Sequence, residues 1–263
     1  MRMRILGAGW ILLGMVPAAT RAQAGPHGGP HEPPGFTLIT DRPFDAKVED
    51  GWTDRGDPWF SIVQDPSAPK SPPGVGQAMF PRGYEGGSGP ILTAHRLGPG
   101  YRDLYLAMWI RFSSNWVGHR SGVNKVLHIW IDGRNKAVLS AQGIGQRPLL
   151  AQLNLQGLNE RQRSRQARPN RGGPAVIQRG SWYLWEVLLH ANTPGRADGR
   201  ATWWLNGQLV GGYDGINFVA AGHPNAWELI YWNPTWGGVK DRVPADQTMQ
   251  IDHLYISGAD PAR

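Results

Sequence analysis

Apolar side chains recur at every second position through most of the chain, and this alternation constrains the fold more than any other feature of the sequence. In residues 103–112, DLYLAMWIRF, five apolar side chains fall on one side of an extended backbone: Leu104, Leu106, Met108, Ile110 and Phe112. Tyr105, Trp109 and Arg111 fall on the other side. Because successive side chains of a β-strand point to opposite faces, one face is predicted to meet the core and the other to meet solvent or a ligand.

Residues 121–133, SGVNKVLHIWIDG, follow the same rule but carry an imidazole near their centre. Alternation puts three aliphatic side chains toward the core, namely Leu127, Ile129 and Ile131. It puts four other side chains on the opposite face: Asn124, Val126, His128 and Trp130. Lys125 falls on the core side, so the alternation leaves it out of a candidate site. Two interpretations of His128 stay open, a packed residue with satisfied ring nitrogens or a group that points into a cleft.

A third stretch, residues 149–156 (LLAQLNLQ), groups its amides on one side: Gln152, Asn154 and Gln156. Further strands are predicted at four places: residues 182–191, 201–205, 227–232 and 249–256. Asn206 and Gly207 form a two-residue hairpin signal between apolar runs. No segment longer than about ten residues keeps a helical period of 3.6. The sequence therefore predicts an all-β protein, a sandwich of two stacked antiparallel sheets.

The first 24 residues predict export. Two arginines precede an apolar run, and the small residues Ala22 and Ala24 follow it, which is the pattern of a secretory signal peptide. No later run reaches the roughly 18 apolar residues of a membrane span. Residues 25–35, GPHGGPHEPPG, predict a flexible leader, because proline and glycine favour neither helix nor sheet. We expect a periplasmic or extracellular location.

Composition restricts the partners and the chemistry. The chain has no cysteine, so it forms no disulfide and has no thiolate zinc site. The formal net charge is +7, but without the predicted signal peptide 24 basic side chains face 20 acidic ones. A charge this small does not point to nucleic acid. The chain has 13 tryptophans, and most of them, including Trp185, Trp203 and Trp204, are expected to pack in the interior.

Residues 36–263 are expected to form one domain, interrupted by the arginine-rich segment 157–180. This segment carries six arginines: Arg161, Arg163, Arg165, Arg168, Arg171 and Arg179. Such a run is either a solvated, mobile loop or a lid that grips an acidic polymer, since guanidinium groups pair with carboxylates and sulfates.

Four stretches carry a resemblance to a known superfamily: VQDPSAPKSPPG at 63–74, HANTPGRADGRATWWLNGQLV at 190–210, YWNPTWGGV at 231–239 and MQIDHLYISG at 249–258. Together they resemble secreted members of the concanavalin A-like lectin and glucanase superfamily, in the branch that includes jelly-roll polysaccharide lyases. The resemblance spans roughly residues 36–258 and implies a two-sheet jelly roll with a sugar-binding groove on one sheet.

The resemblance also implies a set of site residues. Lyases of this branch pair a histidine with a tyrosine, which here implies His128 as base and Tyr231 as acid or second base. Gln152, Asn154 or Arg111 would neutralise a uronate carboxylate. Tyr105, Trp109 and Trp130 would stack on sugar rings beside Asn124. The expected partner is thus an acidic polysaccharide, engaged in an aromatic groove.

The chain departs from the alginate-lyase pattern at two places. It reads Val126-Leu127-His128 where those lyases have Gln-Ile-His, and Tyr231-Trp232-Asn233 where they have Tyr-Phe-Lys. Two functions therefore stay open, a lyase that acts by β-elimination and a non-catalytic glycan-binding or envelope-associated module. The sequence does not decide whether the protein is an enzyme.

Two other kinds of chemistry have little support in the sequence. Hydrolysis by paired carboxylates would need two acids close together, and only Glu186 and Glu228 could be paired across strands. A structural calcium ion would have Asp252 as its carboxylate ligand, and one carboxylate is a poor oxygen shell. No cofactor is expected.

Overall fold

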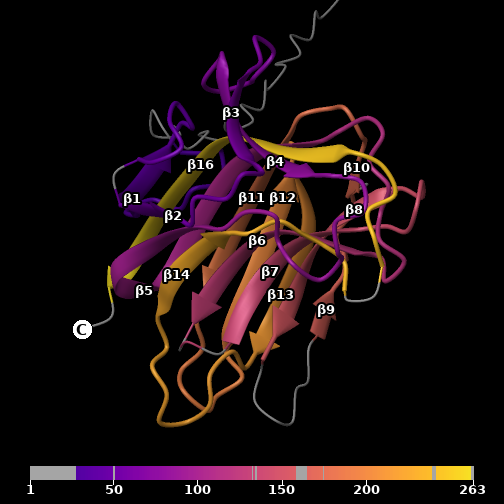
Figure 1. Cartoon of the computed structure of the whole chain (residues 1–263). Helices are drawn as coiled ribbons and strands as arrows, with labels where there is room; N and C mark the ends of the chain where they lie inside the picture. The colour runs from indigo at the N-terminus through magenta and orange to yellow at the C-terminus, as the bar shows by residue number, and fades with distance from the viewer. Residues whose placement is uncertain are drawn as a thin grey trace, which may run out of the picture.

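The structure is a computed structural model that describes residues 28–49, 51–131, 133, 135–157, 165–173, 175–238 and 241–261. Every strand pairing in it is antiparallel, and the described residues contain no helix, so none of them could span a membrane as a helix. Figure 1 shows the strands stacked in two layers. The prediction of an all-β fold is confirmed.

We call one layer the front sheet. Its central strands lie in the order β10-β8-β7-β6-β14-β5. Its members are β2 (Trp52–Asp54), the first half of β5 (Thr93–Phe112), β6 (Val123–Ile131), β7 (Asn135–Gln142), β8 (Leu149–Gln156), β9 (Arg165–Ala167), β10 (Val176–Ile177), β14 (Trp227–Trp232) and β15 (Thr235–Trp236).

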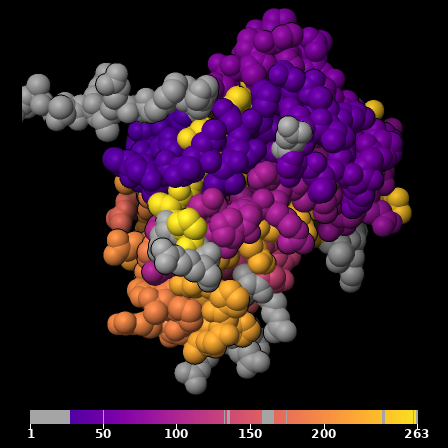
Figure 2. Space-filling model, turned by 90° about the vertical axis from the view of Figure 1, so that its left-hand side faces the viewer, coloured from indigo at the N-terminus to yellow at the C-terminus, as the bar shows by residue number. Residues whose placement is uncertain are grey.

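The other layer is the back sheet. The second half of β5 lies at its centre, between β11 and β16. Its other members are β1 (Thr37–Arg42), β3 (Phe60–Gln64), β4 (Gly74–Phe80), β11 (Tyr183–His190), β12 (Gly199–Leu205), β13 (Gln208–Ile216) and β16 (Gln247–Pro261). Figure 2 shows the indigo N-terminal part of the chain against yellow atoms of the C-terminal part, in keeping with the β1–β16 pairing.

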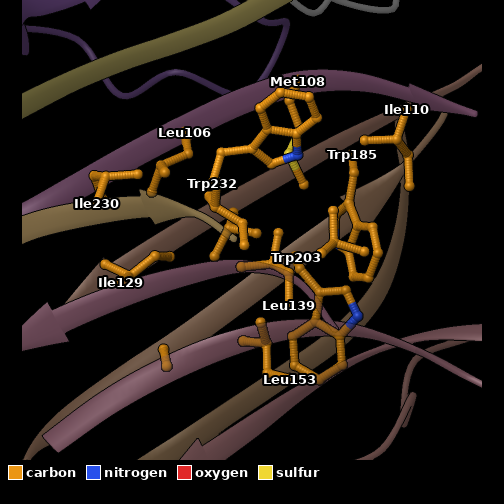
Figure 3. Close-up of a cluster of buried hydrophobic side chains, with 14 of the residues drawn as sticks. Leu106, Met108, Ile110, Ile129, Leu139, Leu153, Trp185, Trp203, Ile230 and Trp232 are labelled. Carbon is orange, nitrogen blue, oxygen red and sulfur yellow. The ribbon is translucent and has the colours of Figure 1, made fainter. Parts of the chain in front are cut away.

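The core lies between the two sheets. Leu106 and Met108 of β5 pack in one cluster with Ile129 of β6, Leu153 of β8 and Trp203 of β12. Figure 3 shows these side chains entering the same interior from strands of both sheets. The alternation predicted for residues 103–112 and 149–156 is confirmed, because the aliphatic set of each strand is buried in this cluster.

The predicted hairpin turn is present, and two of the three tryptophans named as interior residues are buried. Asn206 and Gly207 join β12 to β13 with φ values of 48° and 76°, which is the left-handed geometry of the predicted hairpin turn. Trp185 and Trp203 are fully buried, as predicted. Trp204 is not a core residue: its indole lies on the outer face of the back sheet, stacked on the ring of His31 with centroids 4.6 Å apart.

The predicted signal peptide lies outside the described residues, and so does part of the arginine-rich segment. Residues 28–32 lie against the back sheet, where composition predicted a flexible leader. Arg179, within the arginine-rich segment, donates to the backbone carbonyls of Trp116 at 2.6 Å and Gly145 at 2.9 Å. This guanidinium therefore holds neighbouring loops together.

Candidate active site

A row of side chains crosses the outer face of the front sheet. Tyr231 of β14 pairs with His128 of β6, which pairs with Val138 of β7, which pairs with Asn154 of β8. Directly paired residues of antiparallel strands project to the same face. Three of the predicted site residues, His128, Tyr231 and Asn154, therefore share one surface.

His128 is held as a neutral imidazole in this row. Its side chain is 7% exposed and shares a hydrogen bond with the backbone of Asn233, and Nε2 has no hydrogen-bond partner among the described residues. Burial, together with the charges of Lys125 and Lys136, lowers the pKa of His128 to about 3. An unprotonated Nε2 with a free lone pair can accept a proton.

Lys125 shares this surface, which the alternation had excluded. The register between β6 and β7 shifts between Lys125 and Leu127, so the strand contains a β-bulge there. A bulge inserts one extra residue and reverses the parity of the residues before it. Lys125 consequently lines a depression with Asn154, while burial lowers the pKa of its ammonium group.

The same bulge places Asn124 away from the candidate site. Its side chain is completely buried and donates to the carbonyls of Ala141 at 2.8 Å and Gly143 at 3.2 Å. Its Oδ1 accepts the backbone N–H of His119 at 3.2 Å. The prediction that Asn124 contacts sugar is wrong, because this amide braces loops. Val126 is likewise a core residue instead of a surface one.

Amide side chains continue the polar surface along β8. Gln152 donates to Asn154 Oδ1 at 2.8 Å and to Gln142 Oε1 at 3.2 Å. Asn154 in turn donates to Ser140 Oγ at 2.9 Å. This amide ladder fixes the orientation of each member, and the side chains of Gln152 and Asn154 are almost completely buried.

Aromatic and cationic groups lie in the neighbouring row, in which Trp130 of β6 pairs with Lys136 of β7. The Nζ of Lys136 is 3.9 Å from the centroid of the Trp130 ring, a cation–π contact. Trp130 also meets the ring of Tyr231 edge to face, with centroids 5.6 Å apart. Burial, and then the charge of Lys125, lowers the pKa of Lys136. Trp130 thus lies on the predicted surface, but a lysine covers one face of its indole.

Two depressions flank the amide ladder. The first has a volume of about 230 Å³ and is lined by Ser121, Val123, Lys125, Asn154, Gln156, Gln166, Gly237 and Gly238. The second has a volume of about 270 Å³ and is lined by Gln142, Leu150, Gln152, Arg168, Pro169 and Ala175. Both lie over the front sheet, and His128 and Tyr231 line neither of them. We call the two depressions, together with the adjacent row that contains His128 and Tyr231, the front groove.

Three predicted site residues lie on the back sheet and not in the front groove. Tyr105, Trp109 and Arg111 occupy the half of β5 that pairs with β11 and β16, with the core between them and His128. Tyr105 is fully buried and donates to Glu186 at 2.7 Å. The two sheets expose opposite faces, so these residues cannot meet a ligand together with His128.

Arg111 has a structural role on the back sheet. It pairs with Asp65, donates to Gln250 Oε1 at 2.8 Å and lies 4.6 Å from the ring centroid of Trp182. Its guanidinium is therefore occupied and is not the neutraliser of a carboxylate in the front groove.

The acidic residues do not form the alternative sites. Glu186 lies on β11 of the back sheet and Glu228 on β14 of the front sheet, so they form no catalytic pair. The carboxylate of Asp252 accepts hydrogen bonds from the backbone N–H of Lys70 and from the hydroxyl of Ser71, the latter at 2.7 Å. Hydrogen bonds from the protein thus occupy this carboxylate, and the described residues contain no cluster of three or more His, Asp or Glu suited to a metal ion.

The sequence analysis missed the residues that β7 contributes. In NKAVLSAQ, the outward positions are Lys136, Val138, Ser140 and Gln142, and the small and aliphatic positions between them face the core. This alternation was visible in the sequence and could have identified Lys136. The position of Lys125 had no such signal, because a bulge leaves no trace in the hydrophobic pattern.

No family model matches the chain, and no curated protein matches it either. Solved structures do match. An endo-β-1,4-glucuronan lyase from the fungus Trichoderma reesei superposes with a TM-score of 0.59 at 9% identity, covering 85% of this chain and 96% of that one. An alginate lyase from Aplysia kurodai superposes with a TM-score of 0.57 at 11% identity, covering 84% of this chain and 98% of that one.

A third match is the alginate lyase Aly36B, as a mutant in complex with an alginate tetrasaccharide. Its TM-score is 0.54 at 14% identity, with 70% of this chain and 81% of that chain covered. Identities this low establish the fold and not the reaction. The chain has the concanavalin A-like jelly-roll fold that its structural neighbours, alginate and glucuronan lyases, share.

Proposed function

We propose that the protein is a polysaccharide lyase that cleaves an acidic polysaccharide by β-elimination in the front groove. The observation that carries this proposal is the direct pairing of His128 with Tyr231, beside Lys125 and the amide ladder. A base, an acid and groups that neutralise a carboxylate are the parts that the reaction requires. The fold of the glucuronan and alginate lyases supports the same assignment.

The roles follow from the chemistry of a uronate. Lys125 and Asn154, whose amide nitrogen has a second N–H besides the one donated to Ser140, would hold the carboxylate, which makes the proton on the adjacent carbon more acidic. Gln152 donates both of its N–H groups within the amide ladder and would orient Asn154. Nε2 of His128 would remove that proton. The electron pair then forms a carbon–carbon double bond as the bond to the glycosidic oxygen breaks, and Tyr231 would donate a proton to that leaving oxygen.

The second candidate is a non-catalytic glycan-binding module. It is favoured by the low exposure of His128, which restricts contact with a substrate carbon. For either function we propose an exported protein, on the basis of the pattern in residues 1–24.

Incubation with alginate, polyglucuronate and heparin-like polymers separates the two candidates. A lyase produces an unsaturated sugar, so ultraviolet absorbance should rise with at least one polymer. His128→Gln should lower the rate of this absorbance increase by a factor of about a thousand or more. His190→Gln, which changes a histidine of the back sheet, is the matched control and should keep full activity. Retention on a polysaccharide gel without any rise in absorbance would establish the binding module.

A further inference from the structure

Residues 28–32 lie across the outer face of the back sheet, and we call this segment the strap. The carboxylate of Glu186, which is 0% exposed, anchors it. Glu186 Oε1 accepts the backbone N–H of His31 at 3.0 Å and the hydroxyl of Tyr105 at 2.7 Å, while its Oε2 lies 3.0 Å from His31 Nδ1. A buried carboxylate needs such donors, so displacing the strap is costly.

Two further contacts hold the strap in register. The ring of His31 stacks on the indole of Trp204 at an interplanar angle of 7°, and Glu32 accepts the hydroxyl of Tyr255 at 2.7 Å. Gly29 approaches the sheet so closely that a Cβ atom there would lie 2.1 Å from the hydroxyl of Tyr105. Only glycine fits at this position, which makes Gly29 a means of testing the strap.

The strap and the back sheet together enclose a pocket of about 230 Å³. Its lining comes from the strap, from the loop before β4 and from three strands: Gly28, Gly29, Pro30, Pro69, Lys70, Ala107, Trp109, Leu184, His253 and Tyr255. Trp109 and Leu184 pair across β5 and β11, so their side chains share this face. The pocket thus combines a flat indole and aliphatic groups with polar groups.

Lys70 is the cationic side chain among the residues that line the pocket. Each of the three carboxylates nearby has a partner on the protein: Glu186 binds His31, Glu32 binds Tyr255 and Asp41 pairs with His253. Within the described part of the chain, the ammonium group of Lys70 takes part in no ion pair. Its backbone N–H donates to Asp252, which fixes the loop that carries it.

We propose that this pocket is a second saccharide site, which takes one uronate unit of an acidic polysaccharide. The apolar face of a sugar ring would pack on the indole of Trp109, and its carboxylate would pair with Lys70. The ligand class rests on the proposed function of the front groove. Because the core separates the two sites, the back-sheet pocket would hold the polymer without taking part in its cleavage.

Calorimetric titration with an alginate trisaccharide tests this proposal by its stoichiometry. In the full mature chain carrying His128→Gln, which binds without turnover, we expect two molecules of trisaccharide per chain. Adding Trp109→Ala should reduce the number of bound trisaccharides to one per chain. Adding Gly29→Val, which displaces the strap, should also reduce it to one. Lys70→Met should weaken the second site about tenfold. Trp59→Ala and Gly172→Ala are matched controls that should keep both sites, because Trp59 lines neither site and Gly172 has open space around it.

The outcomes separate this proposal from that of the front groove. If the front groove binds no sugar but the pocket does, the stoichiometry is one and falls to zero with Trp109→Ala. A stoichiometry that Trp109→Ala leaves unchanged overturns the second site. Equal affinity for cellotriose, a neutral trisaccharide, overturns the acidic class of its ligand.

Discussion

His128 shows how burial decides the state of one residue. An imidazole ordinarily has a pKa near 6.5. In this protein burial comes first, and the charges of Lys125 and Lys136 add to it, so that the pKa falls to about 3. The ring is therefore neutral at neutral and mildly acidic pH. It can accept a proton at neutral pH, but a pKa so far below that pH makes it a weak base.

The lowered pKa of His128 makes stability depend on pH. Between pH 6.5 and pH 3 the unfolded chain binds a proton at this ring and the folded chain does not. Stability is consequently full above pH 6.5 and falls as the pH decreases through this window. From pH 7.5 to 4.5, wild type should lose about 3 kcal/mol more of its unfolding free energy than His128→Gln. Urea unfolding at the two pH values measures this difference, and an equal loss in both proteins contradicts the buried, neutral ring.

Asn124 illustrates a polar residue with a structural role. Asn124→Ala would leave the carbonyls of Ala141 and Gly143 and the N–H of His119 without a side-chain partner in a buried place. We expect a loss of about 2–3 kcal/mol in unfolding free energy. Sugar binding by the folded protein should stay unchanged. Urea unfolding measures the first quantity and calorimetry the second, and lost binding in a stable variant would return Asn124 to the site.

At the scale of the element, the bulge in β6 decides the composition of the front groove. Residues after the bulge obey the predicted alternation, so His128 and Trp130 project outward. Residues before it are reversed, so Lys125 projects outward and Asn124 inward. Because of one inserted residue, the groove contains the ammonium group of Lys125 and not the amide of Asn124. The groove therefore has a positive charge that the regular alternation would not give it.

Lys125→Met tests the consequence of this bulge. Removing the ammonium group should reduce kcat/KM on the preferred polyuronate by about a hundredfold, since the substrate carboxylate would lose its cationic partner. Lys47→Met, in the exposed loop after β1, is the matched control and should keep full activity. Steady-state kinetics of the two variants gives the answer. Equal rates would mean that Lys125 does not face the substrate.

At the scale of the whole molecule, two half-buried lysines on one sheet set the electrostatics of the front groove. Lys125 and Lys136 lie on either side of His128 and both lower its pKa, so their fields reach the same point. A polyanion should therefore bind more weakly as salt is added, by about tenfold between 50 and 500 mM NaCl. Lys136→Met should reduce this dependence. Titrations at several salt concentrations measure it, and salt-independent binding would contradict the role of the lysines.

The sequence by itself determined the strands and their parity wherever the backbone is regular. The strand over residues 227–232, the hairpin at Asn206 and Gly207 and the outward amides of β8 could be predicted because local alternation and turn chemistry decide them. The juxtaposition of His128 with Tyr231, expected from the resemblance, has its physical basis in the pairing of β6 with β14.

Only the tertiary structure decided which outward faces belong together. β5 crosses from the front sheet to the back sheet, so Trp109 faces away from His128 although both are outward residues of their strands. The alternation predicts whether a side chain points toward the core or away from it, but it does not predict to which of the two sheets the strand belongs. The strap was equally hidden, because its position depends on Glu186, a partner 155 residues away in the sequence. Long-range pairing of this kind leaves no local pattern to read.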